Sequence, residues 1–257
     1  MRRNLRLLAV AWVLNVKQLT RSSFDGMLAI LWPLFFATVA FFMFRAGGNP
    51  KALIYAALGA AVMGIWTATS VSAGSALQRE RWFGTLELLV AAPAHFSLVL
   101  LPLAFATSAI GVYCMVTTLL WGRFVFGIDL RLEHPLLMAA AIPATILSIG
   151  ALGFLMAVSF ARYRTAWALG AMSEYPIWLL CGFLVPLSLL PGWAHPISWA
   201  LAPTWGMRAI RESSTGGTPL PDVGMCFLLG AVYVGLGVLV TETVLRAARR
   251  TASLSLT

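Results

Sequence analysis

Six long apolar stretches constrain most strongly how this chain can fold. They are residues 27–44, 52–76, 96–121, 136–160, 165–190 and 223–245. A helix rises about 1.5 Å per residue, so about 20 apolar residues cross roughly 30 Å of hydrocarbon. The stretches lack the polar-apolar alternation of barrel strands and are about twice as long as such strands. We therefore predict an all-α membrane protein with six transmembrane helices.

The rest of the chain is too small to form a soluble domain. Hydrophobic residues make up 60% of the 257 residues and charged residues 11%, a balance outside the range of soluble globular proteins. The longest segment between predicted spans runs from 191 to 222, and no internal repeat is visible. Residues 1–257 are therefore expected to form a single transmembrane domain in the lipid bilayer.

The distribution of lysine and arginine predicts the orientation. If the N-terminus is cytoplasmic, twelve of these residues lie on the cytoplasmic side and six on the other. This excess predicts a multi-pass protein of the cell membrane with both termini in the cytoplasm. The net charge of +9 is then a topology signal, with anionic lipid as a further partner, and no nucleic-acid partner is expected.

Residues 1–24 have the pattern of a helix that lies on the membrane surface. At helical spacing one face is apolar, and basic residues cluster on another. The apolar face comprises Leu5, Leu8, Ala9, Trp12, Val16 and Leu19. The alternative is a loosely ordered basic leader.

No pattern in the sequence indicates an active site. The three cysteines and three histidines are scattered, with no metal-ligand spacing, and the chain lacks a phosphate-binding loop and a nucleophile elbow. We therefore expect no catalytic residue, no metal site and no cofactor bound by this chain. If ATP is used, a different chain must bind it.

A charged segment, "LQRERWFGTLELLVAAPAH", separates the second span from the third. The pattern predicts an amphipathic helix over 79–92 that ends before Pro93. Its apolar stripe holds Trp82, Phe83, Leu86, Leu89 and Val90, and its other side holds Glu80, Arg81, Gly84, Thr85 and Glu87. Leu88 points outward with the polar set. A solvated loop is the alternative.

The exact residues of this segment resemble a known motif. "ERWFGTLELLVAAP", Glu80–Pro93, is similar to the Glu-Arg-x-x-Gly-Thr-Leu-Glu segment, followed by a proline, of the permease subunits of type 2 ATP-binding-cassette (ABC) exporters. The order of N-terminal helix, six spans and Trp/Pro-rich outer segment also resembles that family. The resemblance implies that 79–92 is a coupling helix docked on a separate ATPase. The residues expected to face the ATPase are Glu80, Arg81, Gly84, Thr85, Glu87 and Leu88.

The same resemblance implies an assembly and an activity. Two permease chains, as a homodimer or heterodimer, would bind two copies of an ATPase subunit that holds ATP and Mg. This complex would export a drug, lipid, peptide or glycan from the cytoplasm or inner leaflet. The alternative is an ion- or proton-coupled transporter or channel that works without ATP. Such proteins tend to place several ionisable groups within their spans, whereas this chain offers one deep candidate, Glu174.

Glu174 lies about nine residues, or roughly 14 Å, into the fifth predicted span. A charge at such a depth costs about 2.5–3.5 kcal/mol on insertion scales, so the side chain is expected to face protein or water. Pro176, just beyond it, removes a backbone hydrogen bond. We predict a polar contact in or beside the transport path. The alternative is a structural residue between helices.

The outer segment 191–222 is rich in tryptophan and proline. Trp193, Trp199 and Trp205, with Pro191, Pro196 and Pro203, predict short broken helices near the headgroups. The family resemblance implies that this segment re-enters the membrane and narrows the exit. An ordinary interfacial loop is the alternative. Residues 213–219, "SSTGGTP", are expected to form a flexible, exposed link to the sixth span.

Overall fold

The computed structural model describes the backbone of residues 2–21, 23–46, 50–82, 96–128, 133–160, 163 and 165–251 and the side chains of most of them. Over these residues the chain is helical and contains no strand, as the all-α prediction requires. The helices are α1 (Arg2–Arg21), α2 (Ser23–Ala46), α3 (Pro50–Trp82), α5 (Ser97–Phe126), α6 (Pro135–Phe160), α7 (Ala166–Leu180), α8 (Ala194–Ala200), α9 (Ala202–Thr215) and α10 (Leu220–Thr251). A single 3₁₀ turn, η1 (Leu187–Leu189), precedes α8.

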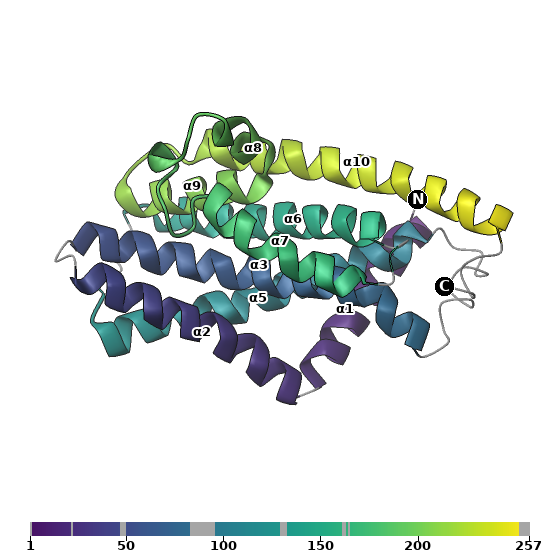
Figure 1. Cartoon of the computed structure of the whole chain (residues 1–257), viewed down its shortest axis with the longest axis horizontal. Coiled ribbons are helices and arrows are strands. Elements are labelled where there is room, and N and C mark those ends of the chain that lie inside the picture. The colour runs from purple at the N-terminus through teal and green to yellow at the C-terminus, as the bar shows by residue number, and fades with distance from the viewer. Residues whose placement is uncertain are drawn as a thin grey trace.

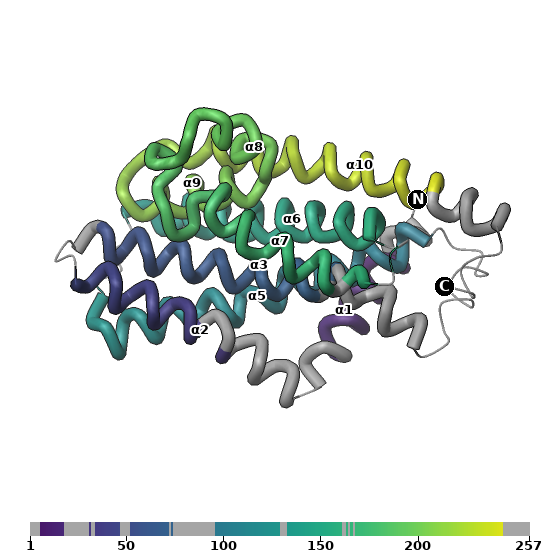
Figure 2. Tube along the Cα trace, in the orientation of Figure 1, coloured from purple at the N-terminus to yellow at the C-terminus, as the bar shows by residue number. Residues whose placement is uncertain are grey.

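The long helices run side by side along the longest axis of the molecule (Figure 1). The short helices α8 and α9 gather at one end, and α1 and the last turns of α10 lie toward the other. Figure 2 traces the same path as a tube and shows α3, α6 and α7 between α10 on one side and α2 and α5 on the other. The chain therefore forms one elongated helical bundle with two distinct ends.

Four described helices are long and apolar enough to cross a membrane. They are Ala52–Val71, Ser97–Phe126, Pro135–Phe160 and Leu220–Thr243, with 20 to 30 residues each. A span needs about 20 residues, so each of the four meets the length requirement. They correspond to the second, third, fourth and sixth predicted spans, which makes this a multi-pass membrane protein. Spanning by all six helices stays a prediction.

The first and fifth predicted spans differ from these four. In α2 the apolar helix among the described residues is the shorter segment Leu34–Ala46. α7 ends at Leu180, ten residues before the predicted end of the fifth span at residue 190. Gly182 adopts a left-handed backbone with φ of +71°, which ends a helix, and Pro186 follows four residues later. Hydropathy did not predict this break, because residues 181–190 are mostly apolar.

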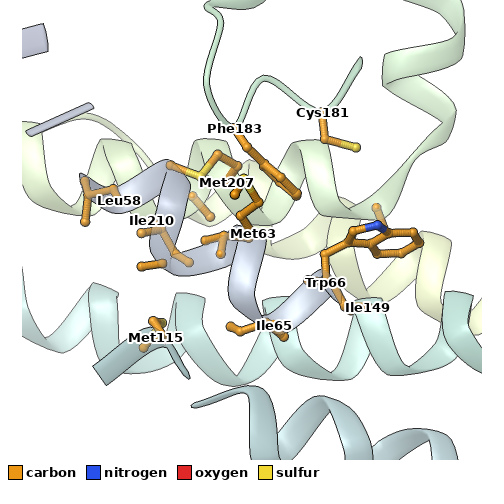
Figure 3. Close-up of a cluster of buried hydrophobic side chains, with 14 of the residues drawn as sticks. Leu58, Met63, Ile65, Trp66, Met115, Ile149, Cys181, Phe183, Met207 and Ile210 are labelled. Atoms are coloured by element: carbon orange, nitrogen blue, oxygen red, sulfur yellow. The ribbon is translucent and has the colours of Figure 1, made fainter. Parts of the chain in front are cut away.

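α3 is the central helix of the bundle. It packs against α2, α5, α6, α7 and α9, and its residues from Ala56 to Trp66 are buried. Figure 3 shows Leu58, Met63, Ile65 and Trp66 of α3 among side chains from the neighbouring elements, such as Met207 of α9. α3 therefore lies inside the bundle, with five other helices packed against it.

Small residues allow the helices to approach α3 closely. A Cβ atom added at Gly111 of α5 would lie 2.6 Å from the Ile65 Cα atom of α3. A Cβ added at Gly150 of α6 would lie 2.6 Å from the Ser108 Oγ atom of α5. In lipid, helices associate mainly through such close packing, because lipid tails are as apolar as the side chains. These two glycines therefore set the spacing of α3, α5 and α6.

The N-terminal helix α1 packs against α5. Its half-buried residues are Leu8, Ala11, Asn15 and Val16, whereas Trp12, predicted to lie on the apolar face, is 39% exposed. Leu8 and Val16 of this packed face also belong to the predicted apolar face, whereas Ala11 and Asn15 do not. The position of α1 on the membrane surface stays a prediction.

The contact of Gly111 with the α3 backbone predicts that substitution of this glycine destabilises the fold more than substitution of a glycine with open space around it. We expect Gly111→Ala to destabilise the folded chain by about 1–3 kcal/mol, the usual range for overpacking, because the Ile65 backbone cannot yield as a flexible side chain can. Gly235→Ala in α10 is the matched control, since nothing lies within 4 Å of its added Cβ. Thermal denaturation in detergent, followed by size-exclusion chromatography, measures both. An equal response of the two variants would contradict the close contact.

Candidate functional site

Glu174 is a buried acidic residue on the side of α7 that faces α3. Its side chain is 5% exposed, and the Thr67 hydroxyl of α3 donates a hydrogen bond of 2.5 Å to Glu174 Oε1. Thr67 belongs to the apolar span Ala52–Val71, so the carboxyl group lies at membrane depth. The structure thus places Glu174 against protein, as the sequence predicts.

Aromatic rings lie one helical turn from Glu174. Residues four apart share a helix face, which places Trp178 beside Glu174 along α7. The Trp178 ring packs edge-to-face on Phe36 of α2 at 5.1 Å and on Tyr175 at 5.0 Å between ring centroids. The Trp178 indole N–H is buried and has no hydrogen-bond partner among the described residues. Acidic and aromatic groups therefore meet where α2, α3 and α7 come together.

Pro176 lies inside α7, two residues beyond Glu174, and the helix continues through it to Leu180. Since proline has no N–H, the Met172 carbonyl lacks its usual intrahelical donor. The face of α7 that carries Met172 is also open, because Met172 is 71% exposed and Tyr175 is 53% exposed. α7 therefore contacts the bundle mainly through α3 and leaves its other face uncovered in this chain.

A second group of contacts fixes the start of α9 deep in the bundle. The Tyr233 hydroxyl of α10 accepts a hydrogen bond of 3.1 Å from the Ala202 N–H and donates one to the Ala200 carbonyl. Tyr233 is thirteen residues after Leu220, so the α8–α9 junction lies about 20 Å along α10 from the start of that helix.

The contacts of α9 with α6 give the same depth. Gly206 lies against Thr145, ten residues or about 15 Å into α6, whereas the Ser213 carbonyl accepts a hydrogen bond of 3.1 Å from the N–H of His134, which precedes α6. α9 therefore runs from deep between α6 and α10 back toward the end of the bundle where both helices begin.

The end of α9 differs from the prediction for 213–219. Ser213 and Ser214 are buried, and α9 continues to Thr215 before Gly216 ends it with φ of +84°. The exposed, flexible link that the "SSTGGTP" composition suggested is therefore wrong for its first residues. Their hydroxyls bond to helix carbonyls of the preceding turn, which lets serine fit a packed helix.

Arg211 ties α9 to two other parts of the chain. Its Nη2 atom donates a hydrogen bond of 3.0 Å to the Phe183 carbonyl, and its guanidinium carbon lies 3.1 Å from the centre of the Tyr55 ring of α3. The Tyr55 hydroxyl donates a bond of 2.9 Å to the Gly182 carbonyl. No carboxylate among the described residues forms an ion pair with Arg211. The cation is held by a ring face and a carbonyl instead.

Arg208 forms a more exposed cluster near the start of α10. It lies 3.5 Å from the buried Asp222 carboxylate and 3.8 Å from Glu212, and its guanidinium carbon is 5.0 Å from the Trp205 ring centre. The Arg208 side chain is 41% exposed, so water screens these pairs. The cluster joins the last turns of α9 to the first turn of α10.

The predicted coupling residues lie at the edge of the described chain. Glu80 and Arg81 belong to the last turn of α3, which continues without a break from the second span to Trp82. The predicted helix 79–92 thus begins as an extension of that span. Gly84, Thr85, Glu87 and Leu88 lie outside the described residues, so their predicted role stays a prediction.

The sequence pointed to Glu174 but not to Arg211, Tyr55 or Tyr233. In the sequence Arg211 is only one of the six basic residues on the outer side of the predicted topology. A usable signal was present in α9, where small residues recur at Ala202, Gly206, Ala209 and Ser213. That spacing indicates a helix packed closely on its neighbours, as membrane-buried helices are.

Comparison with known protein families gives a match. A family model described as ABC-2 type transporter matches residues 6–214, from α1 to the end of α9. The matched region includes Glu80–Pro93 and Glu174. No curated protein matches the chain.

The Arg211 contacts predict a stabilising role for this side chain. We expect Arg211→Met to lower the free energy of unfolding by about 1–3 kcal/mol, because the Phe183 carbonyl loses its donor while the apolar volume is kept. Arg45→Met is the control, since Arg45 is exposed at the end of α2 and should shift stability by less than about 0.5 kcal/mol. Thermal denaturation in detergent compares them. Equal changes in stability for the two variants would contradict a stabilising role of Arg211.

Proposed function

The chain belongs to the ABC-2 type transporter family, and on this premise we propose that it exports its substrate in an ATP-driven complex. As a permease subunit of a type 2 ABC transporter, it is a membrane transport component that partners an ATP-binding subunit. The proposal extends this to direction and energy source: ATP hydrolysis by the partner moves a drug, lipid, peptide or glycan outward. The observation that carries it is the family match over α1 to α9, within which the Glu80–Pro93 motif falls.

The complex would contain two permease chains and two ATPase subunits. The permease pair is a homodimer or a heterodimer, and the ATPase subunits hold ATP and Mg. Both termini and the Glu80–Pro93 segment face the cytoplasm in this arrangement. The location of α1 and of the last turns of α10 at one end of the bundle supports this topology (Figure 1).

α3 is the element that would carry motion from the ATPase to the transport path. It is one helix of 33 residues, so it spans about 50 Å. Glu80 and Arg81 stand in its last turn, Thr67 contacts Glu174 further along, and Tyr55 contacts Arg211 near its other end. A displacement of α3 at the ATPase would therefore change both polar contacts.

α8 and α9 would form the re-entrant segment that narrows the exit. The hydrogen bonds of Tyr233 place their junction about 20 Å along α10 from its start, a depth that an interfacial loop would not reach. The packing of α9 on α6 supports the same depth. Arg211 and Arg208 would hold the segment closed against α3 and α10 in this state.

Mutation of Leu88 tests the coupling assignment. We expect Leu88→Asp to leave expression and membrane insertion near normal but to abolish ATPase co-purification and transport, because only a partner would bury this apolar side chain. Leu88→Met keeps the apolar contact and serves as the matched control. Gly84→Trp should also block docking, since a bulky side chain prevents close backbone approach. Normal transport in both Leu88→Asp and Gly84→Trp would rule out the coupling helix.

Mutation of Glu174 tests its place in the transport path. We expect Glu174→Gln to reduce transport at least about tenfold, as loss of a charged hydrogen-bonding group does, while ATPase co-purification persists. Ser173→Ala is the control, because among the described residues the Ser173 hydroxyl bonds to the Gly170 carbonyl of its own helix. Transport into inverted membrane vesicles measures both variants. Unchanged transport by Glu174→Gln would leave Glu174 with a structural role only.

A further inference from the structure

The segment that follows α7 lies directly against the backbone of α3. A Cβ atom added at Gly59 of α3 would collide with the Phe183 carbonyl oxygen and lie 2.7 Å from the carbonyl carbon. One turn earlier on α3, the Tyr55 hydroxyl donates its hydrogen bond of 2.9 Å to the Gly182 carbonyl. Two consecutive carbonyls beyond the end of α7 are therefore held on one face of α3, where glycine permits the close approach.

α9 contacts the same segment through a cation. The Arg211 Nη2 atom donates its hydrogen bond of 3.0 Å to the Phe183 carbonyl. α7 ends at Leu180, and the dipole of a helix leaves partial negative charge around its C-terminal carbonyls, which favours a cation there. The Phe183 side chain is also buried in the same apolar cluster as Met207 of α9 (Figure 3). The end of α7 is thus bound to α9 as well as to α3.

The charge of Arg211 has no carboxylate partner in the described part of the chain. An arginine keeps its charge at any ordinary pH, and the Nε atom of this side chain is enclosed without a hydrogen-bond partner among the described residues. The Tyr55 ring and the Phe183 carbonyl hold the guanidinium instead. If the end of α7 left α3, the guanidinium would lose its acceptor, and an enclosed donor without an acceptor is costly. This cation therefore ties the place of α9 to that of the end of α7.

We propose that Arg211 is a latch that makes the closed position of α9 depend on the contact between α3 and the end of α7. This inference rests on the proposed export function and names the movement that releases its exit segment. α7 contacts the bundle mainly through α3, so a shift of α7 along α3 withdraws the Gly182 and Phe183 carbonyls from their donors. Arg211 then moves with α9 toward water. The exit segment opens after the end of α7 has left α3.

Hydrogen–deuterium exchange of the backbone tests the latch, because exchange reports local opening segment by segment. Gly182→Ala acts on the end of α7. Gly182 has φ of +71°, where a side chain is strained, and its added Cβ would lie near Leu187 and Val185 rather than near α9. We expect the amides of residues 202–215 in α9 to exchange at least about threefold faster in this variant. Mass spectrometry of the full-length chain in detergent micelles, without the ATPase, measures the exchange.

Gly127→Ala is the matched control for backbone strain. Gly127 is also left-handed, with φ of +66°, but it follows the end of α5 and nothing lies within 4 Å of its added Cβ. We expect this variant to leave exchange of residues 202–215 within about 1.5-fold of the wild type. Exchange of residues 107–115 in α5 reports the stability of the whole bundle and should not change in Gly182→Ala. Unchanged exchange of α9 in Gly182→Ala, or a rise shared equally by α5 or by Gly127→Ala, would overturn the latch.

Arg211→Met assigns the coupling to the named side chain. Adding Gly182→Ala to Arg211→Met should speed exchange of α9 by less than a further factor of about 1.5, because the link between the two segments is already lost. Coupling acts in both directions, so Arg211→Met alone should speed exchange of residues 177–186 at least about threefold. Arg208→Met is the control and should leave 177–186 unchanged, because that side chain pairs with Asp222 of α10.

Two results with these variants would contradict the latch. One is an equal rise of α9 exchange caused by Gly182→Ala with and without the Arg211 side chain. The other is exchange of residues 177–186 that is unchanged in Arg211→Met or rises equally in Arg208→Met. This second measurement decides the question if Gly182→Ala fails to fold, because it needs no change in α7.

The latch and the export function fail separately in this design. If the ATPase co-purifies and the complex transports but exchange at α9 and at 177–186 is not coupled, the latch is wrong and the export function stands. If no ATPase co-purifies with the native chain, the export function is wrong, whatever the exchange shows. Coupling through Arg211 supports the latch in either case, because the measurement uses the permease alone.

Discussion

Close packing of α3 against its neighbours is the interaction on which the other features depend. Lipid offers no hydrophobic drive for helices to associate, so small residues and short interhelical distances must hold the bundle together. The alanines and glycine of α3 from Ala56 to Ala61, and Gly111 opposite Ile65, provide those distances. The polar contacts of Thr67 and Tyr55 reach their partners only because the backbones are this close.

Three features of the chain lie on one continuous helix. α3 carries Glu80 of the predicted coupling motif, the hydroxyl that bonds to Glu174, and the ring that holds Arg211. A helix transmits a displacement along its axis with little loss, since its backbone hydrogen bonds resist extension. In the proposed mechanism, α3 alone would link the ATPase contact to the two polar contacts.

The sequence predicted those features that depend on composition and local spacing. Four apolar spans, the all-α class and the family were predicted from run length and from the Glu80–Pro93 motif, and the four helices and the family match confirm them. Glu174 stood out because a charge in an apolar run is costly. Its hydrogen bond to Thr67 was not predictable, since the two residues are 107 positions apart and nothing local connects them.

The errors have related causes. The end of α7 at Leu180 was not predicted because hydropathy does not distinguish a helix from an apolar irregular segment, and the left-handed conformation of Gly182 leaves no mark on hydropathy. The polar composition of 213–219 suggested exposure, yet Ser213 and Ser214 satisfy their hydroxyls within α9 and pack inside. In both places tertiary contacts outweighed composition.

The hydrogen bonds of the Tyr233 hydroxyl bear on the order in which parts of the chain can fold. It satisfies the backbone at Ala200 and Ala202, where the chain reverses between α8 and α9, and backbone groups left unbonded away from water cost several kcal/mol. Yet Tyr233 is synthesised 31 residues after Ala202. The reversal gains these hydrogen bonds only after α10 has been made and has packed against it, so a helix later in the chain completes the junction of α8 and α9.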